Sequence, residues 1–168
     1  MRERDEIVDQ IPSLRRYARA LTASVDEADD LVQDCLERAC SRWHLFHRDR
    51  ELRPWLFAIM RNLFISAQRS RVRRPRPVPL DEELQQLGAA PEQGGRLQLH
   101  DLSRALLELT EDQREVVLLV GLEGFSYAEA ARIVDAPVGT VMSRLARGRE
   151  RLRRLLDGEE VALVRRVK

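Results

Sequence analysis

The sequence predicts an all-α protein, with two small helical domains joined by a flexible linker and a helix-turn-helix in the C-terminal domain. Three observations support this fold class. Apolar residues recur at helical spacing through most of the 168-residue chain. No stretch alternates in the manner of a β-strand, and only 5% of the residues are aromatic. Prolines and glycines concentrate between Pro75 and Gly95, between two helical blocks.

The first block, residues 1–74, contains three predicted helices. Apolar positions from Ile7 to Leu21 define the first helix, and those from Ala28 to Ala39 define the second, which runs to about Trp43. Acidic residues occupy the first turn of the second helix, where the helix dipole favours negative charge. Residues 44–53 break the periodicity and are predicted to form a loop. Pro54 then opens a third helix, which runs into a basic tail.

The linker is predicted over residues 75–96 and the second block over residues 97–158, followed by a tail, 159–168. Leucines at helical spacing begin this block near Leu97. Thr110 and Gln113 have the three-residue spacing of a capping box and lead into a second helix. These two helices are predicted to form a platform for the segment that follows.

Residues 126–156 have the pattern of two short helices around a tight turn. Ser126 and Glu129 form a second capping-box pattern, and Pro137 separates the two helices. The second helix carries six arginines, which is typical of a helix-turn-helix with a basic recognition helix. A solvated surface helix is the alternative, but the capped first helix and the proline turn favour DNA binding. Gly148 is expected to weaken this helix by roughly 0.5–1 kcal/mol.

The net charge of +1 conceals strong segregation of charge along the chain. Residues 26–37 include six acids and no base, whereas residues 61–76 include six arginines and no acid. A further acidic stretch covers residues 81–101. Such segregation indicates several different contact surfaces instead of one uniform coat.

Composition and motifs argue against several classes of protein. We predict no enzyme and no cofactor, because neither a phosphate-binding glycine loop nor a nucleophile motif is present. A charged N-terminus and the lack of an apolar run of roughly 20 residues predict a cytoplasmic protein without membrane insertion, which we expect to be a monomer when free. Cys35 and Cys40 are predicted to be free thiols. Cys40, His44 and His47 lack a fourth ligand, so no metal site is predicted.

With both blocks in view, residues 5–156 resemble a bacterial RNA polymerase sigma factor of the sigma-70 family, extracytoplasmic-function (ECF) group. The motif ADDLVQDCLERAC resembles the helix that binds the polymerase clamp. WLFAIMRNLFISAQRSRVRR resembles the segment that opens and reads the −10 promoter element. Residues 110–156 are similar throughout to the −35 binding domain. Two motifs in this order and at this separation are more specific than either alone.

The resemblance implies a protein that binds core RNA polymerase, directs it to specific promoters, helps to open −10 DNA and is controlled by an anti-sigma factor. Binding of core polymerase would fall to Asp30, Leu31, Gln33, Asp34 and Glu37. Binding of −10 DNA would fall to Arg61, Asn62, Ser66, Arg69, Arg71 and Arg73. Binding of −35 DNA would fall to Thr140, Met142, Ser143, Arg144, Arg147 and Arg149.

The family builds a pocket for an extruded base in the loop that corresponds to residues 44–53. Trp43, Phe46 and Trp55 flank this loop, and ordinary core packing is the alternative role for the two tryptophans. Met142 stands where the family often has a basic residue, and it cannot donate a hydrogen bond to a base. The −35 DNA sequence that this protein recognises therefore cannot be predicted from the family pattern.

Two other functions fit parts of the sequence. A free-standing helix-turn-helix regulator would bind DNA as a dimer without polymerase, and the two-block layout argues against it. A sigma-like decoy would sequester an anti-sigma factor without touching a promoter, and the arginines of the recognition helix argue against that.

Overall fold

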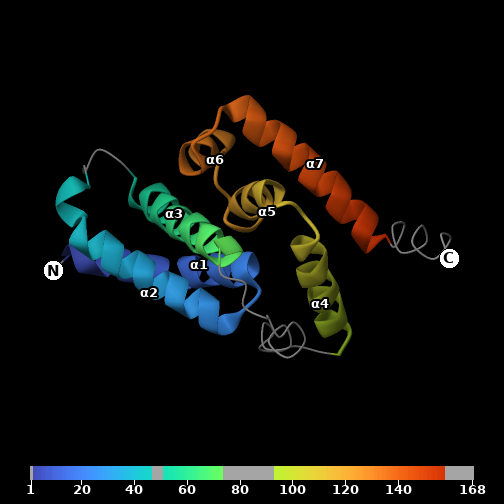
Figure 1. Cartoon of the computed structure of the whole chain (residues 1–168), viewed down its shortest axis with the longest axis horizontal. Helices are drawn as coiled ribbons and strands as arrows, with labels where there is room; N and C mark the ends of the chain where they lie inside the picture. The colour runs from blue at the N-terminus through green and yellow to red at the C-terminus, as the bar shows by residue number, and fades with distance from the viewer. Residues whose placement is uncertain (1, 47–50, 74–92, 158–168) are drawn as a thin grey trace.

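The computed structural model describes residues 2–46, 51–73 and 93–157, and every element in these ranges is a helix. The all-α prediction is therefore confirmed. The elements follow one another as shown in Figure 1: α1 (Arg2–Thr22), α2 (Val25–Ser41), η1 (Trp43–Leu45), α3 (Leu52–Arg73), α4 (Gln93–Leu107), α5 (Glu111–Val117), η3 (Leu118–Leu122), α6 (Tyr127–Val134) and α7 (Val138–Leu156).

Helices α1, α2 and α3 form the first half of the molecule. A tight turn joins α1 to α2, in which Ala23 adopts a left-handed φ of 56°. Ser24 then caps α2 by accepting a hydrogen bond from the backbone N–H of Glu27. Helix α3 packs against both, and its Phe57 ring lies 5.1 Å from the ring of Tyr17 on α1. The three predicted amphipathic helices are thus present.

The predicted loop over residues 44–53 is partly helical. Trp43–Leu45 form the short 3-10 helix η1, and α3 begins at Leu52, two residues before Pro54. Proline is accommodated there because the N–H groups of the first helical turn have no partner within the helix. Residues 47–50, and with them His47, lie outside the described residues.

The second half comprises α4, α5, η3, α6 and α7. Helix α4 begins at Gln93, four residues before the Leu97 start that apolar spacing predicted. The difference arises because Gly94 and Gly95 signal a linker in sequence, yet glycine is tolerated near a helix N-terminus. Residues 74–92 and 158–168, which hold most of the predicted linker and the tail, lie outside the described residues.

Helices α5 and α7 approach each other closely at Gly148. A Cβ atom built on this glycine would lie 2.8 Å from Cγ2 of Val117, so any larger residue forces a shift. The glycine that sequence alone marks as a weakness is therefore a packing requirement. At the start of α5, Thr110 accepts a bond from the backbone N–H of Gln113, but Oε1 of Gln113 is buried without a hydrogen-bond partner. Only half of the predicted capping box is present.

The two halves pack against each other and share one hydrophobic core. Helix α3 lies beside α6, and α1 contacts η3 (Figure 1). At this junction Phe57 meets Phe125 with ring centroids 4.9 Å apart, and both side chains are almost fully buried. The division into two domains stays a prediction, but the halves it separates are in contact here.

Candidate nucleic-acid and partner interfaces

The helix-turn-helix has well-defined ends. Ser126 and Glu129 make the complete capping box that their spacing predicts, and the hydrogen bonds from Ser126 lower the pKa of Glu129 below its usual value. Asp135 ends α6 in the left-handed region at φ 51°, and Pro137 is the N-cap of α7. Val141, Leu145 and Gly148 are buried, so the opposite side of α7 faces solvent.

Two of the predicted −35 residues hold defined positions on the exposed side of α7. Ser143 donates from Oγ to the carbonyl of Gly139 at 3.0 Å, and Arg147 donates from Nε to the carbonyl of Ser143 at 3.3 Å. Both residues are exposed, as is Met142, which is 49% accessible. Because these three residues are exposed on one turn-and-a-half of α7, they are accessible to a groove of DNA.

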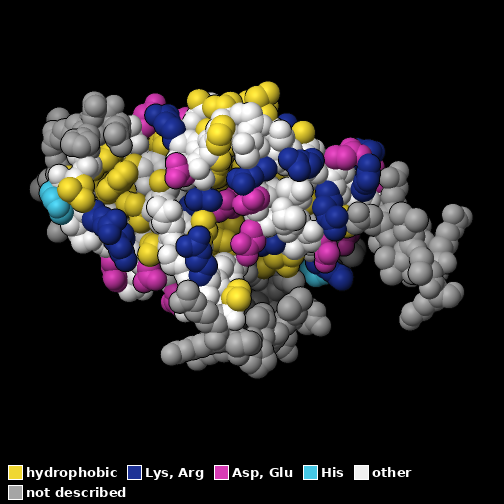
Figure 2. All heavy atoms as spheres, turned by 45° about the horizontal axis from the view of Figure 1, so that its top comes forward, with side chains coloured by type: hydrophobic (Ala, Val, Ile, Leu, Met, Phe, Trp, Pro, Cys, Tyr) yellow, Lys and Arg dark blue, Asp and Glu magenta, His cyan; other side chains and the backbone are white. Residues whose placement is uncertain are grey.

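Arg144 is held differently from the other predicted −35 residues. Its guanidinium pairs with Asp112 of α5 at 2.8 Å, and only 24% of its side chain is exposed. Because residues turn about 100° apiece around an α-helix, Met142 and Arg149 lie about 140–180° away from Thr140 and Arg144. One DNA groove cannot meet all six positions in the same way. Figure 2, which turns α6 and α7 toward the viewer, shows arginine and acidic side chains interspersed on this face.

The predicted −10 residues divide into a stripe and two paired arginines. Asn62, Ser66, Arg69 and Arg73 follow a spacing of four, three and four, so they share one face of α3. The side chains of Asn62, Ser66 and Arg69 are exposed, and Arg73 is the last residue of the helix. We call this face the α3 stripe.

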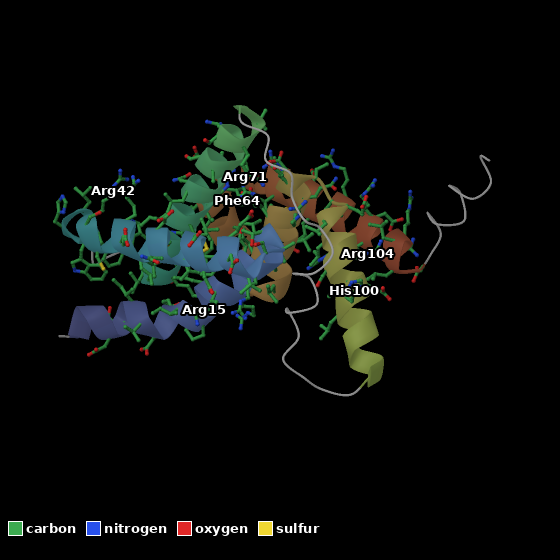
Figure 3. The ribbon with its side chains drawn as sticks, turned by 60° about the horizontal axis from the view of Figure 1, so that its bottom comes forward. Arg15, Arg42, Phe64, Arg71, His100 and Arg104 are labelled. Atoms are coloured by element: carbon green, nitrogen blue, oxygen red, sulfur yellow. The ribbon has the colours of Figure 1, made fainter. Side chains whose placement is uncertain are left out.

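Arg61 and Arg71 lie off the α3 stripe and are engaged within the protein. Arg61 pairs with Glu115 of α5 at 3.1 Å, where the two side chains are 14% and 3% exposed. Burial raises the pKa of Glu115, and the charge and hydrogen bond of Arg61 oppose that rise. Arg71, near the end of α3 in Figure 3, pairs with Glu27 at 2.6 Å. Arg61 therefore connects the two halves instead of facing solvent.

The predicted polymerase contacts lie on α2. Asp30, Gln33, Asp34 and Glu37 are exposed and share one face at helical spacing, a set that we call the α2 stripe. Gln33 donates to Glu37 at 3.1 Å along this face. Leu31 is only 7% exposed and packs in the core of the described structure, and its contact with polymerase stays a prediction.

Sequence reasoning missed the polar centre of the junction between the halves. The side chain of Glu123, which follows η3, is fully buried. Its carboxylate accepts two hydrogen bonds from Arg16 at 2.9 and 2.8 Å, one from Arg53 at 2.8 Å and one from Ser13 at 2.6 Å. Arg53 also donates to the backbone carbonyl of Glu123 at 2.7 Å. The available signal was a single acid within the apolar segment LLVGLEGF.

Aromatic rings surround this polar centre on one side. The guanidinium carbon of Arg53 lies 4.2 Å from the centroid of the Phe125 ring and 5.4 Å from that of Phe57. Gly124, at φ 71°, makes the turn that lets Glu123 and Phe125 both reach the first half. We call Glu123, Ser13, Arg16 and Arg53 the Glu123 cluster.

Three aromatic residues form a second, more open group beside η1. Rings of Trp43, Phe46 and Trp55 lie between 5.0 and 6.2 Å from one another, and each residue is partly exposed. The alternative of ordinary core packing therefore does not describe them fully.

A groove of about 1020 Å³ opens between α1 and α4, and η3 and α7 complete its walls. Leucines of α4 and Ile11 of α1 make it mainly apolar, and Arg15, Arg16 and Arg19 line its α1 side. The Nε atom of Arg19 is buried without a hydrogen-bond partner in the described structure. Figure 3 shows Arg15 on α1 and His100 on α4, the two helices that border the groove.

Comparisons with known proteins agree with this arrangement. Residues 7–61 match the family described as the Sigma2 domain of PhyR, and residues 99–152 match Sigma-70, region 4. The chain is 42% identical over 159 residues to the ECF RNA polymerase sigma factor EcfG of Rhodopseudomonas palustris, covering 94% of this chain and 87% of that protein. It is 36% identical to the ECF RNA polymerase sigma factor SigC of Mycobacterium tuberculosis, covering 83% and 75%.

Solved structures give the same result. The sigma factor RpoE of Bartonella quintana, solved in complex with the anti-sigma factor NepR, superposes with a TM-score of 0.80 at 38% identity and covers 92% of this chain and 96% of that one. CnrH, solved with the cytosolic domain of CnrY, has a TM-score of 0.68 at 28% identity, covering 92% and 86%. The region 2 and region 4 matches, together with ECF relatives of 42% and 36% identity that cover most of the chain, define a sigma-70-type initiation factor. The chain belongs to the ECF RNA polymerase sigma factors.

Among the described residues, no helix is both long and apolar enough to cross a membrane. No group of three or more metal-ligating side chains gathers among them, and Cys35 is buried while Cys40 is exposed.

Proposed function

We propose that this ECF sigma factor binds core RNA polymerase through the α2 stripe, engages −10 DNA through the α3 stripe and reads −35 DNA through the exposed side of α7. The observation that carries the proposal is the separation of an acidic exposed face on α2 from arginine-bearing exposed faces on α3 and α7. An acidic face repels DNA and suits a protein surface, whereas basic faces attract phosphates.

On α7 the roles divide by geometry. Ser143 and Arg147 lie on the most exposed side near the N-terminal half of the helix, where a recognition helix reaches base edges. Arg144, tied to Asp112, positions the helix or contacts phosphate. Phosphate contacts fix register without reading sequence, so we assign base reading to Ser143 and Arg147.

On α3 the stripe of Asn62, Ser66, Arg69 and Arg73 follows the strands around the −10 element. Opening a duplex costs about 1–2 kcal/mol per stacked step, so an opened base needs a surface on which to stack. The partly exposed rings of Trp43, Phe46 and Trp55 supply such a surface near the N-terminal end of α3. Leu31, Arg61 and Arg71 are not assigned to contacts with DNA or polymerase in the conformation described here.

We also propose that an anti-sigma factor controls this protein in the cytoplasm, by binding the groove between α1 and α4. RpoE of Bartonella quintana was solved with the anti-sigma factor NepR. The groove combines apolar walls with arginines on one side, and the unpartnered Nε of Arg19 offers a donor to a carboxylate. An amphipathic helix with acidic residues along one edge fits this chemistry.

Reconstituted transcription tests the function. The chain is added to core RNA polymerase with a library of promoter fragments from its own genome, and start sites are mapped by run-off synthesis. We expect initiation at a defined set of fragments, and Arg69→Ala to reduce open-complex formation while leaving core binding intact. Arg71→Ala is the matched control, because Arg71 is on the same helix but lies off the α3 stripe. Specific duplex binding by a dimer that ignores core polymerase would instead establish a free-standing regulator.

A further inference from the structure

The N-terminal end of α7 carries an apolar surface that the polar reading residues do not explain. Among the described residues, α7 exposes three large apolar side chains: Val138 and Met142, one turn apart at its start, and Leu156 at its end. Figure 2 shows hydrophobic side chains at the surface over α6 and the beginning of α7. The first turns of a recognition helix are the part that reaches base edges. Val138 and Met142 are therefore placed where DNA sequence is read.

Small residues surround Met142 on this side of the helix. Gly139 lies three positions before it and Ala146 four positions after it, so the three residues share one face, and all three are exposed. A Cβ atom built on Gly139 would meet no atom within 4 Å. The Met142 side chain thus projects beyond its neighbours along this face, and a base edge can approach it closely.

The polar groups of the same turns lie on the adjacent side of α7. Ser143 donates to the carbonyl of Gly139, and Arg147 donates to the carbonyl of Ser143. Because successive residues turn about 100° around a helix, Ser143 and Met142 present a polar side and an apolar side to one groove. Met142 has no N–H or O–H to donate, and its sulfur is a weak acceptor. What it contributes to sequence recognition is therefore an apolar contact.

Thymine is the base whose major-groove edge carries a methyl group. Its C5-methyl lies beside the O4 acceptor, whereas guanine, adenine and cytosine are distinguished by donors and acceptors alone. Apolar side chains contact this methyl group. A methionine suits the contact, because its side chain is unbranched, flexible and polarizable.

We propose that Met142, with Val138 beside it, reads the C5-methyl group of a thymine in the −35 element and sets a preference for a T·A pair at a position that Ser143 and Arg147 do not read. This role rests on the −35 binding proposed above. It gives the position at which the chain departs from the family pattern a recognition chemistry of its own.

Removal of that methyl group from the DNA has a predictable effect on affinity. Deoxyuridine differs from thymidine only in lacking the C5-methyl group, so its hydrogen-bonding groups are unchanged. From the transfer free energy of one buried methyl or methylene group, we expect binding to become about three- to fivefold weaker when the contacted thymine is replaced by deoxyuridine.

The experiment is a double-mutant cycle between DNA and protein. Holoenzyme made from the full chain and core polymerase binds a promoter fragment identified by run-off synthesis, and each thymine of its −35 element, on either strand, is replaced in turn by deoxyuridine. Competition binding compares wild type, Met142→Ala and Leu156→Ala. Leu156→Ala is the matched control, because Leu156 and Met142 are both 49% exposed and lie toward opposite ends of one helix.

The expected result is specific to one contact. At least one thymine should respond, so that its replacement weakens binding of wild type and of Leu156→Ala by about three- to fivefold. Met142→Ala should bind the thymine and deoxyuridine duplexes alike, at about the affinity that wild type has for the deoxyuridine duplex. Because both side chains are exposed, helicity should match wild type in both variants.

The proposal is overturned if no thymine of the element responds, or if the loss caused by deoxyuridine persists in Met142→Ala. Failure of the chain to bind core polymerase would instead refute the proposed function. The same cycle, run with the chain alone on a duplex that it selects from the promoter fragments, then still decides the role of Met142. A chain that selects no duplex either alone or with core polymerase would refute both.

Discussion

Replacing Arg61 by alanine tests whether this arginine is a structural partner of Glu115. The Glu115 side chain is only 3% exposed and that of Arg61 is 14% exposed, so the variant leaves a buried carboxylate without its counter-charge. Loss of one partner of a buried ion pair costs about 3–5 kcal/mol. Because Arg61 retains some exposure and Glu115 can protonate, we expect a loss near the lower end, about 3 kcal/mol of unfolding free energy at neutral pH.

The structure also predicts how the contribution of Glu115 to the free energy of unfolding changes with pH. Burial raises the folded-state pKa of Glu115 above its ordinary value of 4.5, so the folded state holds this proton more firmly than the unfolded chain does. The contribution of Glu115 to stability therefore falls as pH rises from 4.5 through the folded value. Removing Arg61 raises that pKa further. The deficit of Arg61→Ala relative to wild type should consequently be smaller at about pH 5 than at about pH 8.

Urea denaturation followed by circular dichroism measures these differences. Arg71→Ala is the control, because its ion pair with Glu27 is 46% and 32% exposed and should contribute at most about 1 kcal/mol. Replacing both partners, as in Arg61→Met with Glu115→Leu, should recover most of the lost stability. Equal losses for Arg61→Ala and Arg71→Ala, or a deficit that grows on acidification, would refute the reasoning.

Three further predictions concern the proposed interfaces and their scaffold. Arg147→Ala should weaken discrimination among −35 sequences by about 1–3 kcal/mol in competition binding, whereas Arg144→Ala should weaken all sequences alike; a uniform loss for Arg147→Ala would make it a phosphate contact. Gly148→Ala should lower the free energy of unfolding by about 1 kcal/mol, since the clash with Val117 outweighs the gain in helix propensity, and a stabilised variant would contradict the close approach. Asp34→Arg should impair co-elution with core polymerase at unchanged thermal stability; unaltered co-elution would remove the α2 stripe from the interface.

The helices themselves could be predicted from sequence because periodicity reports which face of a helix is buried. The burial of Val141, Leu145 and Gly148 follows directly from their four-three spacing. The capping box at Ser126 could also be predicted from the sequence, since both partners lie within one helical turn. Local patterns of this kind need no knowledge of the rest of the fold.

Contacts between the halves could not be predicted, because they join residues far apart in the chain. Arg61 and Glu115 are 54 positions apart, and Arg16 and Glu123 are 107 apart. An arginine that will pair with a buried carboxylate has the same local sequence context as one that will meet a phosphate. The sequence therefore could not show that Arg61 pairs with Glu115 of α5, or that Arg144 pairs with Asp112 of the same helix.

The most direct test of the sigma-factor assignment is gel filtration of the purified chain mixed with core RNA polymerase. The account predicts a 1:1 complex that initiates at specific promoters, and a monomer when the chain is run alone. A symmetric dimer that elutes apart from core polymerase yet binds duplex DNA tightly would contradict it.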